Sequence, residues 1–239
     1  YLSAKNFVDV DRIKRAIVEL YEADFHKIDG TGRLSRLFAD IPTQLHRRAS
    51  RYSMAGALGR NRTQGGARLI AELVDSRAVL AAYHVNEPSA GLSLSKDPGR
   101  FKLYLSDTGL FTTLAFRDRE FTDNIIYQKL LSDRLPANLG YLYENIVAQT
   151  LAANGRQLYY HTFPNEKKTN LYEIDFLVPR KNKICPLEVK SSGYKRHASL
   201  DAFSERYSQH IDEKYLIYTK DLQREHDVLC LPVYMAQFL

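Results

Sequence analysis

Residues 172–178 have the sequence YEIDFLV and residues 183–190 the sequence KICPLEVK, and this pair of stretches determines the expected fold. Both are short, mostly apolar runs with β-branched or aromatic residues, as strands commonly are. The polar residues 181–183 between them suit the turn of a β-hairpin. If they form that turn, the two strands pair and Asp175 lies beside Glu188.

The elements expected around this hairpin indicate a mixed α/β core. An amphipathic helix is expected over residues 139–153, where Asn154 and Gly155 provide a suitable C-terminal cap. The order helix, three strands, helix, strand then predicts an α/β domain with mixed strand pairing. The remaining expected elements are strands over 158–161, 172–178 and 183–190, a helix over 200–207, and strands over 215–218 and 228–234.

The first hundred residues are expected to form a separate, largely helical domain. Between residues 9 and 23, apolar residues recur at helical spacing, and Asp9 is the candidate N-cap. Helices followed by a strand and a loop predict a winged helix, with domains at 1–100 and 101–239. The apolar positions are Val10, Ile13, Ile17 and Leu20, and the later elements are helices over 33–39, from Thr43 toward Arg51 and after Gly65, a strand over 79–85 and a turn-rich connector over 86–100.

The composition is that of an ordinary globular protein. The 239 residues are 44% hydrophobic and 26% charged, which excludes disordered, collagen-like and coiled-coil chains. No apolar run approaches the roughly 20 residues needed to span a bilayer, and no signal sequence is evident. Cys185 and Cys230 lack metal-binding spacing, so a reducing, cytoplasmic compartment is expected. Because the chain begins at Tyr1, we expect it to be part of a longer protein.

A local excess of arginine gives the chain its basic character. The net charge is +6, and residues 33–68 contain eight arginines but a single acid, Asp40. Such a field attracts nucleic-acid phosphates, so we expect this segment to bind DNA, although a solvated helix face would have the same composition. The arginines are Arg33, Arg36, Arg47, Arg48, Arg51, Arg60, Arg62 and Arg68.

Acidic side chains near the hairpin are candidate metal ligands. Glu188 and Lys190 project from the same sheet face because alternate strand residues share a face, and the hairpin brings Asp175 beside them. Two carboxylates suit Mg²⁺ or Mn²⁺, which prefer oxygen ligands and retain water, and Lys190 would hold the attacking water. Glu144, among apolar residues of the helix over 139–153, is a further candidate ligand. The alternatives are a salt bridge on a solvated strand face and an exposed helix position for Glu144.

These residues resemble the pattern of the PD-(D/E)xK nuclease superfamily, whose core is also helix, three strands, helix, strand. The matching positions are Glu144, Asp175, Glu188 and Lys190, and Ile174 stands where the pattern has proline. The resemblance extends over residues 20–235 to the C-terminal half of AAA-type ATPases that carry a nuclease-like domain of unknown function. It rests on the segments IPTQL at 41–45, YLSDTGL at 104–110 and GYLYEN at 140–145.

This resemblance implies a restriction-endonuclease-like domain that acts as a metal-dependent DNA nuclease. Asp175 and Glu188 would bind Mg²⁺ or Mn²⁺ with Glu144 as a further or water-bridged ligand, and Lys190 would be catalytic. The resemblance also implies an N-terminal ATPase domain as a partner outside this chain. The sequence contains no GxxxxGK[ST] phosphate loop, so we expect no ATP binding here. The alternative is an inactive module that binds nucleic acid or a partner for that ATPase.

Overall fold

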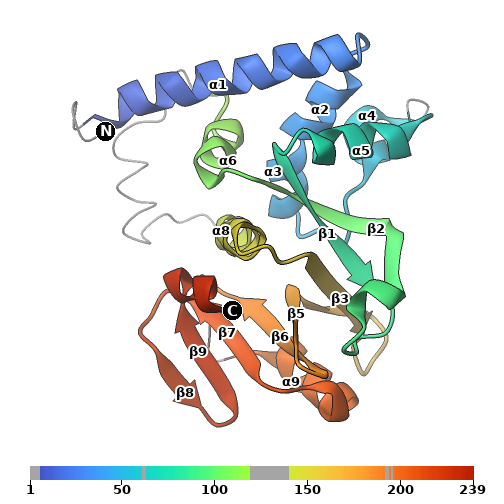
Figure 1. Cartoon of the computed structure of the whole chain (residues 1–239), viewed down its shortest axis with the longest axis vertical. Helices are drawn as coiled ribbons and strands as arrows, with labels where there is room; N and C mark the ends of the chain where they lie inside the picture. Colours follow the sequence, from blue (N-terminus) through green and yellow to red (C-terminus); the bar gives the residue numbers. More distant parts are fainter. Residues whose placement is uncertain (1–5, 61–62, 119–139, 192–193, 195) are drawn as a thin grey trace. The chain divides into compact units, whose positions relative to one another are not determined.

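The computed structural model describes residues 6–60, 63–118, 140–191, 194 and 196–239, and it has an α/β fold (Figure 1). The chain divides into two compact units. Unit 1 comprises residues 1–80 and 104–142, and unit 2 comprises residues 81–103 and 143–239. The chain therefore passes between the units three times, and the second passage, after Leu103, lies near the boundary that the sequence suggests at Arg100.

Unit 1 is largely helical. It contains α1 (Phe7–Ile28), α2 (Arg33–Ala39), α3 (Ile41–His46), α4 (Met54–Leu58), α5 (Gly66–Asp75) and α6 (Thr108–Ala115). Aromatic residues of α1 and α2 meet in its core, where the ring centroids of Phe25 and Phe38 lie 5.3 Å apart. The buried Tyr52 hydroxyl donates to the Leu37 carbonyl at 2.7 Å and so ties the segment before α4 to α2. The helices expected at the positions of α2 and α5 are confirmed.

Two helices of unit 1 begin earlier than expected. α1 begins after Asn6, whose side-chain oxygen accepts from an amide of the first turn at 2.9 Å, so Asp9 is not the N-cap. α3 begins at Ile41 and already contains Thr43, so the expected cap at Thr43 is wrong. Pro42 explains this start, because proline is well tolerated in the first turn, where amides lack helical partners.

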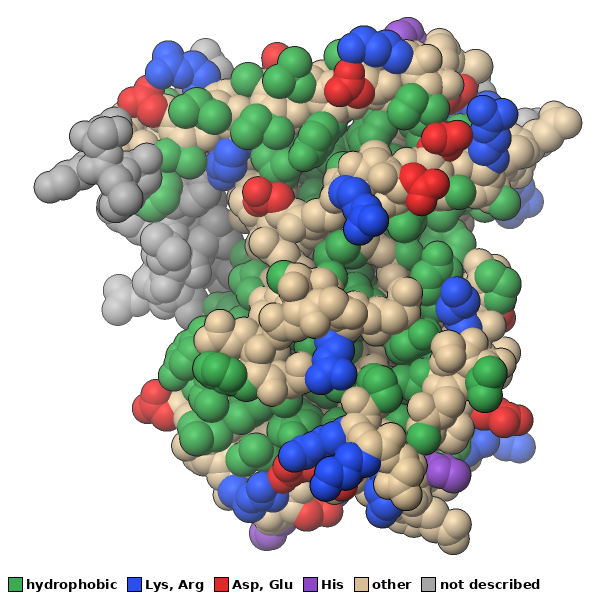
Figure 2. All heavy atoms as spheres, viewed as in Figure 1, with side chains coloured by type: hydrophobic (Ala, Val, Ile, Leu, Met, Phe, Trp, Pro, Cys, Tyr) green, Lys and Arg blue, Asp and Glu red, His purple; other side chains and the backbone are tan. Residues whose placement is uncertain are grey.

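The face that α1 buries also differs from the apolar stripe in its sequence. Ile13 and Leu20 are 62% and 65% exposed, and hydrophobic side chains are visible along α1 in Figure 2. Asp11 lies on the buried face because its carboxylate accepts from Arg15 at 2.8 Å and from the Thr113 hydroxyl of α6 at 3.3 Å. The buried residues of α1 are Asp11, Val18 and Phe25.

Unit 2 contains most of the strands, which form two sheets. The first sheet has the order β2-β1-β3-β4 and the second the order β5-β6-β7-β9-β8. The ends of β1, β2 and α8 extend into the residues of unit 1. The elements are β1 (Val79–Val85), η2 (Leu92–Ser95), β2 (Lys96–Leu105), α8 (Gly140–Ala153), β3 (Leu158–Pro164), β4 (Leu171–Ile174), β5 (Phe176–Arg180), β6 (Lys183–Val189), α9 (Ala198–Tyr207), η3 (Ser208–His210), β7 (Lys214–Tyr218), β8 (Gln223–Glu225), β9 (Val228–Pro232) and η4 (Val233–Phe238).

The expected order of helix, strands, helix, strand is present in this unit as α8, β3, β4, β5, β6, α9 and β7. The single strand expected over residues 172–178 is wrong, because the chain breaks at Asp175 into β4 and β5, which belong to different sheets. β5 pairs antiparallel with β6, whereas β6 is parallel to β7, so the pairing is mixed. The hairpin turn comprises two residues between the paired Arg180 and Lys183, and Lys181 adopts a left-handed φ of 54° there. β2 begins at Lys96, inside the segment over 86–100 that the sequence predicts to be a turn-rich connector.

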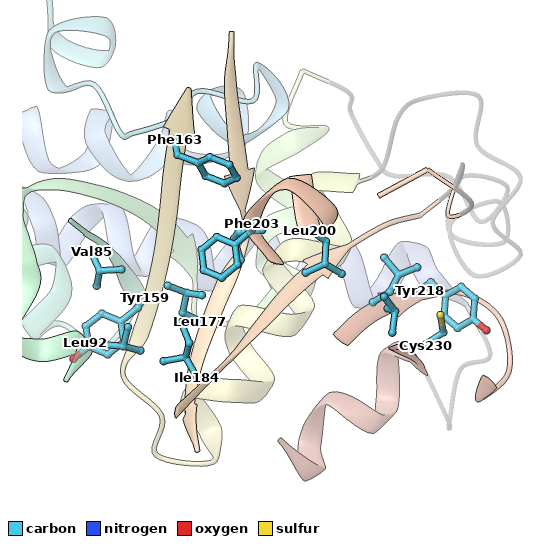
Figure 3. Packing of buried hydrophobic residues seen from close by; sticks show 13 residues of the cluster. Val85, Leu92, Tyr159, Phe163, Leu177, Ile184, Leu200, Phe203, Tyr218 and Cys230 are labelled. Atoms are coloured by element: carbon cyan, nitrogen blue, oxygen red, sulfur yellow. The ribbon is translucent and has the colours of Figure 1, made fainter. Parts of the chain in front are cut away.

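The core of unit 2 forms between its strands and α9. Leu200 and Phe203 of α9 are fully buried, and the ring centroids of Phe163 and Phe203 lie 5.9 Å apart. These residues belong to one buried cluster with Leu177 of β5 and Ile184 of β6, and Figure 3 shows Phe203 next to Leu177. The strands that carry the hairpin are therefore held in a packed interior. Within the described residues, no helix combines the length and the apolar character that crossing a membrane requires.

Candidate functional site

The hairpin places Asp175 close to the end of β6 that carries Glu188. Phe176 pairs with Leu187 at the last step of the antiparallel register, and Asp175 and Glu188 are the next residues along their segments. Asp175 occupies the break between β4 and β5, where its Oδ2 accepts from the Val189 amide at 2.7 Å. This hydrogen bond fixes the carboxylate at the end of β6.

Glu188 is buried and has one oxygen without a partner. The residue is 8% exposed, and its Oε1 lies 3.1 Å from the Lys190 ammonium. Oε2 is buried and accepts no hydrogen bond from the described residues. Burial raises the pKa of Glu188, and the Lys190 charge opposes that rise. Such an oxygen is costly to bury unless a ligand satisfies it.

Lys190 is held at the end of β6 from two sides. Its backbone amide donates to the Ile217 carbonyl of β7 at 2.8 Å, and its ammonium donates to the Arg196 carbonyl as well as contacting Glu188. The structure therefore brings together Asp175, Glu188 and Lys190. It also shows the salt bridge between Glu188 and Lys190 that was the alternative interpretation, although on a buried strand rather than a solvated one.

A buried lysine connects the hairpin to α8. Lys102 of β2 is 4% exposed, and its ammonium hydrogen-bonds to Glu173 of β4. The same nitrogen lies 3.8 Å from Oε2 of Glu144 and 5.5 Å from the ring centroid of Tyr160. Glu144 is therefore not an exposed helix residue, because its carboxylate lies in the ion-pair network around Lys102.

These side chains influence one another electrostatically. The acidic cluster consists of Glu144, Glu173, Asp175 and Glu188. Burial raises the pKa of Asp175 well above its ordinary value, and the negative charges of Glu144 and Glu173 add to this effect. The Lys102 charge opposes it. A further positive charge near Asp175 would therefore stabilise the ionised form of its carboxylate.

The donor set suits one hard cation better than two. Among the described residues, no three His, Cys, Asp or Glu side chains converge as the ligands of one metal ion. Asp175 and Glu188 offer two carboxylates, one of them with an unpartnered oxygen, which fits a Mg²⁺-type ion whose remaining ligands are water. Oε2 of Glu144 already lies 3.8 Å from the Lys102 ammonium.

Lys102 and Glu173 are members of this site that the sequence reasoning missed. A signal was present at Lys102, which is a single charge in the apolar run FKLYL at residues 101–105. A charged residue at such a position is buried only when it is paired. Glu173 lies two residues before Asp175 in the same short motif.

The arginines of unit 1 fall into two groups. The side chains of Arg33, Arg36 and Arg68 form hydrogen bonds or ion pairs with nearby residues of unit 1. Arg33 donates to Asp29 and to the Gln64 carbonyl, Arg36 donates to backbone carbonyls between α1 and α2, and Arg68 pairs with Glu72 at 3.5 Å. These three side chains therefore have structural partners.

The other arginines are exposed. Arg47, Arg48, Arg51 and Arg60 lie between α3 and α5, and their side chains make no ion pair or hydrogen bond with the described part of the chain. Arg48 adopts a left-handed φ of 52° at the end of α3. Arg62 lies outside the described residues. On the face shown in Figure 2, basic and acidic side chains are interspersed, so any basic field is local.

Two family models, both described as domains of unknown function, match parts of the chain. No curated protein and no solved structure matches the sequence. Residues 2–120 match a family described as a domain of unknown function, DUF8612. Residues 139–235 match a second domain of unknown function, DUF4143, which is found in proteins associated with AAA-type ATPases, and the expected resemblance is confirmed to that extent.

Proposed function

We propose that this chain is a Mg²⁺- or Mn²⁺-dependent phosphodiesterase that cleaves DNA and works with an ATPase domain. The observation that carries the proposal is the Asp175 carboxylate, held by the Val189 amide next to Glu188, together with the buried, unpartnered oxygen of Glu188. Lys190 lies beside them. Carboxylates and an ammonium group at one strand end are the groups that phosphodiester hydrolysis requires.

Each residue has a defined role in this proposal. Asp175 and Glu188 supply oxygen ligands, and Glu144 contributes through water. The cation, when bound, offsets charge on the scissile phosphate and makes a water more acidic. Lys190 donates to the attacking water from its position at Oε1 of Glu188. The Asp175 carboxylate is held for this task by the Val189 amide.

The chain order supports a restriction-endonuclease-like assignment for unit 2. The sequence α8, β3, β4–β5, β6, α9, β7 follows the order of the PD-(D/E)xK core, with Ile174 in place of proline before Asp175. In the N-terminal part, α4 and α5 followed by β1, a connector and β2 have the order of a winged helix. A cytoplasmic location belongs to the same proposal, because both described cysteines are buried and free.

The DNA-binding part of the proposal rests on the exposed arginines. Arg47, Arg48, Arg51 and Arg60 have charges that no described residue neutralises, so they are available for phosphates. Arg33, Arg36 and Arg68 are less suited to this role because their guanidinium groups already have partners. DNA would therefore contact the segment between α3 and α5.

A nicking assay tests the proposed activity. Supercoiled and linear DNA are incubated with Mg²⁺ or Mn²⁺ and the wild-type chain, Glu188→Gln or Lys190→Met. We expect both variants to lose cleavage and to retain DNA binding. Glu166→Gln, an exposed carboxylate in the β3–β4 connection, is the matched control and should cleave normally. Activity that survives both site substitutions would indicate a contaminant and would overturn the assignment.

The second candidate is a binding module without nuclease activity. It is favoured by the buried Lys102 ammonium, which already neutralises part of the acidic cluster, and by the lack of a three-acid ligand set among the described residues. Absence of cleavage by the wild-type chain with either cation, together with DNA binding that requires Arg47, Arg48 and Arg51, would support this candidate.

A further inference from the structure

We propose that Lys102 is a built-in cation that occupies the part of the acidic cluster where a second divalent ion would otherwise bind. On this view the chain takes a single divalent ion, at Asp175 and Glu188, and Lys102 positions Glu144 and Glu173 in place of a metal. The inference rests on the metal site of the proposed function and deepens it.

The lysine lies where a cation is needed. Its ammonium is placed between Glu173 of β4 and Glu144 of α8, with a hydrogen bond to the first and 3.8 Å to Oε2 of the second. Lys102 is 4% exposed, so water solvates its ammonium group only slightly. An ammonium group is buried at great cost unless carboxylates compensate it. The burial of Lys102 therefore depends on the carboxylates of Glu144 and Glu173.

Charge balance leads to the same conclusion. When all four carboxylates of the acidic cluster are ionised, they and the ammonium groups of Lys102 and Lys190 together carry two formal negative charges, which one divalent cation balances. Removing the Lys102 charge leaves Glu144 and Glu173 without their cation. Oxygen ligands with uncompensated charge attract Mg²⁺ and Mn²⁺.

The test measures metal binding rather than cleavage. Isothermal titration and electron paramagnetic resonance count the Mn²⁺ ions bound by the wild-type chain and by Lys102→Met, and thermal denaturation is followed with and without Mn²⁺. We expect Lys102→Met to bind one more Mn²⁺ ion than the wild-type chain does. We also expect Mn²⁺ to raise its melting temperature more than that of the wild-type chain, because the ion replaces the missing ammonium.

A matched control is available in the same unit. Lys214 of β7 is also a largely buried lysine and pairs with Asp227, away from the acidic cluster. Lys214→Met should therefore bind the same number of Mn²⁺ ions as the wild-type chain. Lys102→Arg, which keeps the charge, should also retain the wild-type stoichiometry. An extra ion in either variant would refute a specific role for the Lys102 charge.

A second variant keeps the proposal falsifiable if Lys102→Met does not fold. Lys102→Gln also removes the positive charge but keeps a side-chain donor for the carboxylate of Glu173, so Glu144 and Glu173 both remain to bind the additional ion. Wild-type stoichiometry in a folded Lys102-deficient variant, with no selective stabilisation by Mn²⁺, would overturn the inference. An extra Mn²⁺ ion in a chain whose wild type cleaves no DNA would support the inference and refute the nuclease proposal.

Discussion

Lowering the pH from 7.5 to 4.5 is expected to destabilise this protein through His161 of β3. The residue is 3% exposed, and both ring nitrogens have partners. Nδ1 lies 2.7 Å from the Val85 carbonyl, which can only accept, so the ring donates from Nδ1. Nε2 is then free of a proton and accepts from the Tyr207 hydroxyl at 3.2 Å. His161 is therefore neutral in the folded chain.

Protonation of this ring is unfavourable in the folded state. Burial lowers the pKa of His161 to about 4, the hydrogen bond to Val85 opposes this shift, and the nearby positive groups His84, Arg206 and Arg100 add to it. His84 stacks on the ring with centroids 5.3 Å apart, and burial lowers its pKa as well. The two histidines are therefore expected to act in the same direction.

The sign and size of the effect follow from linkage. An unfolded histidine has a pKa of about 6.5, so between pH 6.5 and 4 the unfolded chain binds a proton that the folded chain does not. The contribution of His161 is complete above that range and is lost as the pH falls through it. With a folded pKa of about 4, the contribution of His161 to the free energy of unfolding should fall by about 3 kcal/mol, at about 1.4 kcal/mol per pKa unit. Asp175 and Glu188, whose pKa values are raised by burial, act in the opposite direction, so the His161 contribution is read from the difference between the wild-type chain and a His161 variant.

The assay is urea denaturation followed by circular dichroism at several pH values. His161→Asn retains an amide donor for the Val85 carbonyl but does not titrate, so it should be less stable at pH 7.5 and lose less stability on acidification. His226→Asn is the control, because His226 is exposed and its φ of 54° suits asparagine. Equal pH dependence in His161→Asn and the wild-type chain, or an NMR pKa near 6.5 for His161, would refute this reasoning.

Three further predictions concern unit 1. Tyr52→Phe removes the buried donor to the Leu37 carbonyl, so urea denaturation should show a loss of about 1–2 kcal/mol, and unchanged stability would contradict this role. Asp107→Ala removes the N-cap of α6, whose carboxylate accepts from two amides at 2.6 and 3.1 Å. We expect the free energy of unfolding to fall by about 1 kcal/mol, and Asp107→Asn should largely restore it. Replacing Arg47, Arg48 and Arg51 by Ala should reduce the slope of log affinity for DNA against log salt by about 0.9 for each DNA phosphate that an arginine no longer neutralises, and Arg12→Ala on α1 should leave it unchanged.

The hairpin could be predicted because its geometry is local. Two strands joined by a short turn have a register that the turn length sets, and alternation assigns each side chain to a face. The Val189 amide and the Asp175 carboxylate that it binds are only 14 residues apart. The juxtaposition of Asp175 and Glu188 is therefore contained in a segment short enough to be deduced from its sequence.

The buried face of α1 could not be predicted from the same kind of pattern. Helical periodicity identifies Val10, Ile13, Ile17 and Leu20 as one stripe, yet two of these side chains are largely exposed. The face that packs contains Asp11, whose charge is compensated by Arg15 and by a hydroxyl of α6. Periodicity measures where apolar residues gather, and it carries no information about partners that an aspartate finds about a hundred residues away.

The same distinction explains why the sequence identifies Glu144 as a candidate but not its partner Lys102. Lys102 and Glu173 are 71 residues apart and lie on the two edge strands of one sheet, with β1 and β3 between β2 and β4, and Glu144 comes from α8. Local sequence could show that a lysine among apolar residues needs a carboxylate, but not which one. The tertiary fold decides that choice. In our proposal the Lys102 ammonium supplies a positive charge to the acidic cluster, so a count of carboxylates from the sequence overstates the number of divalent ions that bind there.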